Sequence, residues 1–202
     1  MSFRRAVAAH GGETRLALVS DTPPSISGPL ACGLRDVAAE LVGAEVVERA
    51  LDRLSGELRT RYQTATAVEW MPIDVMEEAF SAIAAELGTD VASLHERVAT
   101  VSIERTFRTV WRMLLRLTTD KALVSRTPSV FARSYNRGRL VAEIPRPGRG
   151  EITLLDWPNV PAWPQRATRI GIATVLRLAG RNDVRVDFAP TATGARYVAT
   201  WR

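Results

Sequence analysis

The stretch SIERTFRTVWRMLLRL, residues 102–117, has the periodicity of a helix with one apolar face and one arginine face. At about 100° per residue, five apolar residues fall on one side of that helix: Phe107, Val110, Trp111, Leu114 and Leu117. Four arginines fall on the opposite side: Arg105, Arg108, Arg112 and Arg116. Ser102 suits the N-cap, because its hydroxyl can accept a hydrogen bond from an amide of the first turn. Such a helix places its aromatic side in a core and turns its cations towards solvent or an anionic partner.

The segments before this helix are also helical in pattern. We expect four helices there, over residues 29–41, 44–62 and 72–87, and from Thr89 or Asp90 to about Val98. Gly43 ends the first helix, while Pro72 starts and Gly88 stops the third, which is the usual asymmetry of helix ends. Residues 1–28 are treated as an N-terminal extension, with a short strand over residues 14–20.

After the arginine-faced helix the period changes from 3.6 to about 2. The expected elements are a turn or two of helix over 118–126, a helix over 128–135, a hairpin of strands 140–144 and 152–155, a helix over 161–179, and strands 184–188 and 197–201. This order predicts an α+β fold, in which an N-terminal helical bundle packs on a C-terminal four-stranded antiparallel sheet. Residues 29–202 are expected to form one domain with a strand–strand–helix–strand–strand second half.

The composition limits where the chain works and what it binds. Of 27 basic residues, 26 are arginine; this bias is typical of a high-GC genome. Residues 1–100 carry a net charge of −6 and residues 101–202 a net charge of +11, which together give the overall +5. No apolar run approaches the roughly 18–20 residues that cross a bilayer, and the one cysteine excludes an internal disulfide. We therefore expect a cytoplasmic protein, in which this charge polarity favours either head-to-tail association or an anionic partner for the second half.

The sequence offers few groups for catalysis or metal binding. His95 reads as a solvated helix residue, far in sequence from His10, and Cys32 as a small buried hydrophobe. No cysteine or second histidine has metal-ligand spacing to His95. There is no G-x-S-x-G, Walker A or G-x-G-x-x-G pattern. We expect no catalytic residues, no metal and no cofactor, and therefore not an enzyme.

Two sets of residues are candidates for binding. Four aromatic residues of the central helical region either pack the core or line an apolar pocket between helices and sheet: Trp70, Trp111, Phe131 and Tyr135. Arg105, Arg108, Arg112 and Arg116 are either ordinary solvated charge or a partner-facing surface. The partner could be an acidic protein, including the acidic half of another copy. Nucleic acid is disfavoured because the sequence contains no helix-turn-helix, RRM or zinc-binding motif.

Several short motifs carry a resemblance to a known group of proteins. They are Trp70-Met-Pro72 before a helix that ends Glu86-Leu-Gly88, then Tyr135-Asn-Arg-Gly138, Leu178-Ala-Gly-Arg-Asn-Asp183-Val-Arg-Val, and Gly194-Ala-Arg-Tyr-Val-Ala-Thr-Trp201-Arg. From Gly43 onward the chain resembles the superfamily of heme-NO-binding sensor domains, V4R small-molecule-binding domains and Bet3-like vesicle-tethering subunits. More narrowly, it is similar to a largely myxobacterial set of proteins related to that superfamily.

The departures from the family pattern decide what the resemblance implies. Heme-binding members use a proximal histidine ahead of the sheet and a Tyr-x-Ser-x-Arg signature, whereas residues 103–135 hold no histidine and the signature is absent. One cysteine cannot build the cysteine-rich metal site of V4R domains. Cys32 lies before the matching region, so the acylated cysteine of some Bet3-like proteins is not carried over.

What the resemblance leaves is a scaffold that encloses an apolar ligand and often dimerises. We expect a non-enzymatic sensor or adaptor module that binds a small apolar ligand, a protein partner or both, without heme. The alternative is a structural or assembly protein that uses the fold for self-association, and nucleic-acid binding through the arginine face is the less favoured third hypothesis.

Overall fold

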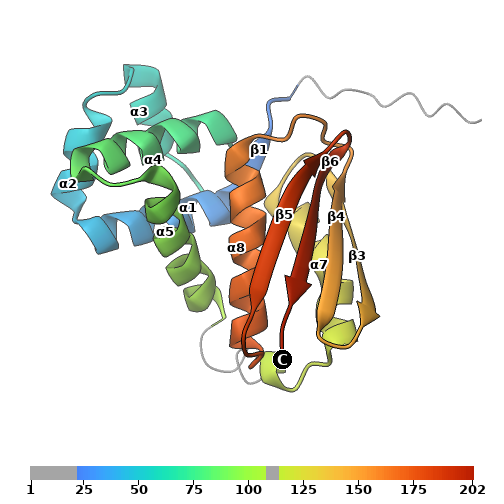
Figure 1. Cartoon of the computed structure of the whole chain (residues 1–202). Helices are drawn as coiled ribbons and strands as arrows, with labels where there is room; N and C mark the ends of the chain where they lie inside the picture. Colours follow the sequence, from blue (N-terminus) through green and yellow to red (C-terminus); the bar gives the residue numbers. More distant parts are fainter. Residues whose placement is uncertain (1–21, 108–113) are drawn as a thin grey trace, which may run out of the picture.

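A computed structural model describes residues 22–107 and 114–202. Figure 1 shows the order of elements along the chain. The N-terminal half contains β1 (Ser25–Ser27), α1 (Gly28–Val42), α2 (Ala44–Leu51), α3 (Gly56–Gln63), β2 (Trp70–Pro72), α4 (Ile73–Leu87) and α5 (Val91–Thr106). The C-terminal half contains α7 (Asp120–Ser134), β3 (Arg139–Arg146), β4 (Arg149–Leu155), α8 (Ala162–Leu178), β5 (Arg185–Thr191) and β6 (Gly194–Thr200).

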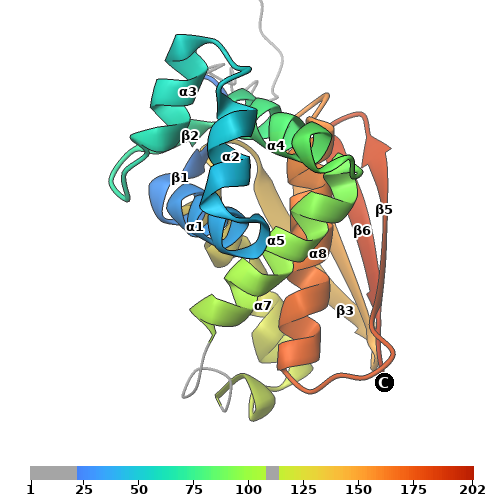
Figure 2. The ribbon, with the colours of Figure 1, turned by 90° about the vertical axis from the view of Figure 1, so that its left-hand side faces the viewer.

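The predicted α+β architecture is confirmed, and α8 is the layer that joins its two halves. The helices α1–α5 form a bundle on one side of α8, and the four-stranded sheet lies on the other (Figures 1 and 2). α8 contacts α5 on its bundle side and β5 and β6 on its sheet side, while α7 packs along β3. The buried residues of bundle and sheet therefore form one continuous core.

The sheet has the strand order β3-β4-β6-β5, with every neighbouring pair antiparallel. Side chains alternate across it, so Ile152 and Leu154 of β4 and Tyr197 of β6 are buried on the inner face. Ile152 and Tyr197 are cross-strand partners. The expected hairpin is confirmed, and β3 and β4 extend to Arg146 and Arg149, which leaves a turn shorter than predicted.

The end of the segment treated as an extension takes part in the fold. Strand β1 pairs antiparallel with β2, and Ile26 is fully buried. The backbone N–H of Ser25 donates to Oδ1 of Asn136 at 2.8 Å, and the N–H of Asn136 donates to the carbonyl of Ser25 at 3.2 Å. These bonds tie residues 25–27 to the end of α7. The strand expected over residues 14–20 lies outside the described residues.

Two of the predicted N-terminal helices end where expected. α1 stops before Gly43, which has φ 93°, and α4 stops before Gly88, which is left-handed with φ 62°. The single helix expected over 44–62 is wrong, because the chain breaks into α2 and α3. Ser55 caps α3, its Oγ accepting a hydrogen bond from the N–H of Leu58 at 3.3 Å. A capping serine competes with helix continuation, and the apolar period alone does not reveal that competition.

The expected start of the arginine-faced helix is also wrong. α5 runs without interruption from Val91 to Thr106, capped by Asp90, whose Oδ2 accepts a hydrogen bond from the N–H of Ser93 at 2.8 Å. Ser102 is therefore a buried residue within a helix and not an N-cap. Leu114 and Leu117 are 50% and 81% exposed, so they do not continue a buried apolar face.

The helix expected to begin at Pro128 begins eight residues earlier. α7 spans Asp120–Ser134 with Pro128 in its interior, and Thr119 caps it by accepting from the N–H of Ala122 at 3.3 Å. The cap and the packing of α7 along β3 outweigh the hydrogen bond that proline removes. In residues 22–107 and 114–202, no helix is long and apolar enough to cross a membrane.

Candidate functional site

The structure brings together two of the four aromatic residues proposed for a pocket. The rings of Phe131 and Tyr135 stack with centroids 4.7 Å apart, and both residues are buried. Trp70 is 46% exposed on β2 and does not join the core. Trp111 lies outside the described residues.

Tyr135 belongs to a packed aromatic layer between α7, α8 and the sheet. Its ring meets the ring of Trp157 edge-on at 5.9 Å, and Trp157 is 2% exposed. Burial raises the pKa of the Tyr135 phenol, and it raises the pKa of Tyr197 to about 12. These phenols stay neutral, and their rings fill the space between helices and sheet.

His95 lies in the core and not in solvent, which corrects the prediction from the sequence. It is 0% exposed, stacked on Trp163 of α8 and edge-on to Phe80 of α4. Neither ring nitrogen has a hydrogen-bond partner among the described residues. Desolvation, aided by the charge of Arg166, lowers the pKa of His95 to about 3. Cys32, expected to be buried, is half-buried on α1 and donates to the carbonyl of Ala65.

The four arginines proposed as one partner-facing surface have different surroundings. Arg105 forms an ion pair with Glu40 of α1 at 2.5 Å, and this hydrogen bond raises the pKa of Arg105. It therefore ties α5 to α1. Arg108 and Arg112 lie outside the described residues. Arg116 is exposed and lies at a hollow in the surface.

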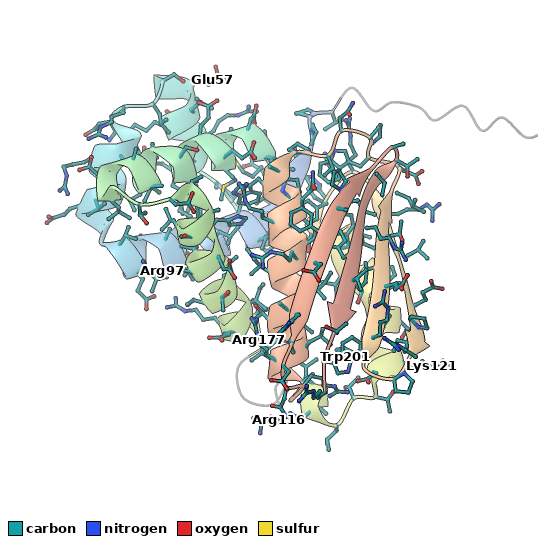
Figure 3. The ribbon with its side chains drawn as sticks, in the orientation of Figure 1. Glu57, Arg97, Arg116, Lys121, Arg177 and Trp201 are labelled. Atoms are coloured by element: carbon teal, nitrogen blue, oxygen red, sulfur yellow. The ribbon has the colours of Figure 1, made fainter. Side chains whose placement is uncertain are left out.

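That hollow, which we call the arginine hollow, is the candidate functional site. Its volume is about 780 Å³, and it lies where α7 begins and where α8 and β6 end. It is lined by Arg116, Asp120, Arg177, Ala179, Gly180, Arg181, Asn182, Trp201 and Arg202. Figure 3 shows Arg116, Arg177 and Trp201 together at this end of the molecule.

One wall of the arginine hollow is a fixed hydrogen-bond network around Asp120. Its Oδ1 accepts from Nε and Nη2 of Arg181 at 2.8 and 2.6 Å, and its Oδ2 accepts from Nε1 of Trp201 at 3.1 Å. Arg181 also donates to the carbonyls of Thr118 and Ala179 at 2.8 and 2.5 Å. The Asp120 carboxylate is therefore already engaged by an arginine and a tryptophan.

The remaining cations of the arginine hollow are open to solvent. In the described part of the chain, Arg116 and Arg177 have no acidic partner and no hydrogen bond from their guanidinium groups, and both are exposed. Arg202 pairs with Asp183 at 3.2 Å, but the two side chains are 86% and 62% exposed. Four guanidinium groups thus share this open hollow with the carboxylate of Asp120, and Asp183 beside Arg202 is a second carboxylate; the remaining excess of positive charge favours binding of an anion.

A second hollow, of about 310 Å³, lies between α1, α2 and α3. Its arginine, Arg35, is engaged by Asp36 and by the carbonyls of Gln63 and Ala65. Tyr62 also lines this hollow, and burial raises the pKa of the Tyr62 phenol. This hollow therefore offers an incoming ligand less charge than the arginine hollow does.

Sequence reasoning found Arg116 and missed the other cations of the arginine hollow. Arg177, Arg181 and Arg202 are more than 60 positions away, and only the fold brings them beside it. The available signal was the excess of positive charge in the second half. The lining residues include four arginines, whose guanidinium groups suit binding of an anion. In residues 22–107 and 114–202, no cluster of His, Cys, Asp and Glu could hold a metal ion.

No protein-family model matches the chain, and no curated protein is similar to it in sequence. Solved structures are similar in fold. The Fe(II) unliganded H-NOX protein from K. algicida matches with a TM-score of 0.65 and 10% identity, over 87% of this chain and 96% of that one. An oxygen-binding H-NOX domain related to soluble guanylate cyclases matches with a TM-score of 0.63 and 13% identity, over 87% and 95%. A mutant of the T. tengcongensis H-NOX matches with a TM-score of 0.64 and 13% identity, over 87% and 97%. The chain therefore has an H-NOX-like fold.

Proposed function

We propose that this protein is a non-enzymatic sensor or adaptor module that binds an anionic ligand or an acidic protein partner at the arginine hollow. The observation that carries this proposal is the pair of exposed guanidinium groups of Arg116 and Arg177, without acidic partners in the described residues, at a concave site. The apolar ligand expected from the family resemblance has less support, because aromatic side chains fill the space between helices and sheet.

The described residues do not fit a heme. Some of the similar solved structures are described as iron(II) or heme proteins, yet α7, the helix ahead of this sheet, holds no histidine, cysteine or methionine. The rings of Phe131, Tyr135 and Trp157 pack against one another beside it. His95 is on α5 with one ring face covered by Trp163. The module is therefore proposed to work without heme.

Hemin titration tests this part of the proposal. We expect no sharp Soret band of one-to-one stoichiometry. A saturable Soret band that disappears in the His95→Leu variant would show that the core opens to admit heme, and would overturn the heme-free proposal.

Native mass spectrometry at two ammonium acetate concentrations tests the binding function. We expect an anionic adduct, or a complex with an acidic protein, that is lost in Arg116→Glu/Arg177→Glu and weakened at the higher salt. Lys121→Glu makes the same kind of charge change on an exposed residue that does not line the hollow, and should behave like the parent protein. Equal binding by all three proteins would contradict the proposal.

The alternative is an assembly protein, supported by the net charges of −6 and +11 in the two halves. An assembly protein would appear in the same mass spectra as an oligomer that dissociates at the higher salt concentration and carries no bound anion. Cytoplasmic location, dimerisation and the narrower likeness to V4R, Bet3-like and myxobacterial proteins stay predictions.

A further inference from the structure

We propose that the arginine hollow is a binding site for a small polyphosphate, a ligand with two or more linked phosphate groups that Arg116 and Arg177 clamp. This inference rests on the proposed function, because it names the chemical class of the anion that the module binds. Arg181, which the Asp120 network holds in place, forms the back wall.

The charge of the hollow comes from its arginines. The helix dipoles oppose each other at the hollow, because α7 begins there with its positive end and α8 ends there with its negative end. They therefore do not decide the sign of the charge in the hollow. The one acidic side chain among the lining residues, Asp120, already accepts three hydrogen bonds from two side chains. An incoming anion therefore meets Arg116 and Arg177, which have no acidic partner among the described residues, and Arg202, which pairs with the exposed Asp183.

The size and the chemistry favour linked phosphates over a single small anion. A hollow of about 780 Å³ falls within the range of sites that hold whole small molecules. Guanidinium groups bind phosphate oxygens through two parallel hydrogen bonds, and two such groups match a ligand that carries more than one negative charge. An acidic protein surface is the competing occupant, which a poly-glutamate peptide represents in the test below.

The tryptophan of the hollow limits what else is recognised. Trp201 is 8% exposed, because its ring packs towards Gly150 and its Nε1 donates to Asp120. It offers no free face for a nucleobase to stack on. We therefore infer that the site recognises the phosphate chain and is indifferent to an attached nucleoside.

Isothermal titration calorimetry of the full chain with sodium tripolyphosphate and with ATP tests this inference. One-to-one binding is expected, with affinities for the two ligands within about threefold, since a stacked base would add 1–3 kcal/mol or about fivefold or more. Arg116→Gln/Arg177→Gln should weaken tripolyphosphate binding by at least about tenfold, the loss expected for charge-assisted hydrogen bonds. Arg97→Gln, at an exposed arginine of α5 far from the hollow (Figure 3), is the control for the loss of one arginine charge elsewhere and should bind like the parent protein.

The outcomes separate this inference from the function on which it rests. If a poly-glutamate peptide binds in a manner that depends on Arg116 and Arg177 while tripolyphosphate does not bind, the polyphosphate site is wrong and the binding module stands. If neither probe binds, both are wrong. Equal weakening by the Arg97 variant would assign the affinity to overall charge and would overturn the site. Circular dichroism melts of each variant show whether it is folded.

Discussion

The imidazole ring of His95 lies parallel to the indole ring of Trp163, with 4.3 Å between the centroids and 6° between the planes. The edge-on ring of Phe80 completes the contact, so one residue each from α4, α5 and α8 meets at this point. The stack is stabilised by its burial and ring geometry. It also leaves both imidazole nitrogens without hydrogen bonds in the described structure, which costs about 1–3 kcal/mol.

The free energy of unfolding should fall with acid because of His95. An unfolded histidine takes up a proton near pH 6.5, whereas the pKa of folded His95 is lowered to about 3. Between these values only the unfolded chain binds that proton. Stability should therefore decrease as pH falls from 6.5 towards 3, with a slope from this group of up to about 1.4 kcal/mol per pH unit. Urea unfolding at a series of pH values measures it.

Replacing the imidazole by a ring that cannot be protonated should remove this acid dependence. His95→Phe keeps an aromatic stack on Trp163 and deletes two unpartnered nitrogens. We expect the free energy of unfolding of this variant to exceed that of the parent protein by about 1 kcal/mol at pH 7. The difference should grow as the pH is lowered to 5. Chemical denaturation of both proteins at the two pH values measures this. A constant difference between the proteins would assign the acid dependence to other groups.

Two glycine-to-alanine substitutions should have opposite effects on stability. A Cβ on Gly28 would lie 2.6 Å from the carbonyl oxygen of Glu69 and closer still to that of Thr66, so β2 and the turn before it would have to move. Gly28→Ala should cost about 1–3 kcal/mol. Gly171→Ala, in the middle of α8 with no atom within 4 Å of the added carbon, should gain about 0.5–1 kcal/mol from helix propensity. Thermal melts compare the two variants, and a loss for both would contradict this account.

Asp120 should hold the end of β6 to the start of α7. Asp120→Ala removes the acceptor of the Trp201 indole N–H and of two Arg181 bonds, and should cost about 1–3 kcal/mol. Urea unfolding measures this cost, and the combined emission of the five tryptophans should shift to longer wavelength as the surroundings of Trp201 loosen. Asp187→Asn changes an exposed acid of β5, and is expected to stay within about 0.5 kcal/mol of the parent protein. Equal effects of the two variants would show that the network around Asp120 is not special.

The hydrophobic period predicted the elements that pack on one face. α4 and the four strands of the sheet have a clear period of 3.6 or 2, and glycine marks the end of α1 and of α4. These local signals agree with the tertiary structure. The break before α3 and the proline inside α7 were missed, because capping and packing on β3 outweigh the helix signals there.

The candidate site depended on contacts that the period does not encode. His95 was expected in solvent because its helix neighbours are polar, yet Trp163, 68 positions later, covers its ring. Arg105 and Arg116 belong to one sequence pattern, but an ion pair with Glu40 takes up the first while the second faces the hollow. The cations that join Arg116 come from the ends of α8 and β6.

The strand order has a consequence for synthesis. β6 is the last element of the described chain, but it lies between β4 and β5. While residues 194–200 are still inside the ribosome, β4 has only β3 beside it and β5 has no neighbour in the sheet. The helices can form from local contacts as they emerge, whereas the inner face of the β3–β4 hairpin waits, exposed, for the strand that completes it. A ribosome that stalls shortly before this strand would present an unfinished sheet edge and an apolar surface to chaperones.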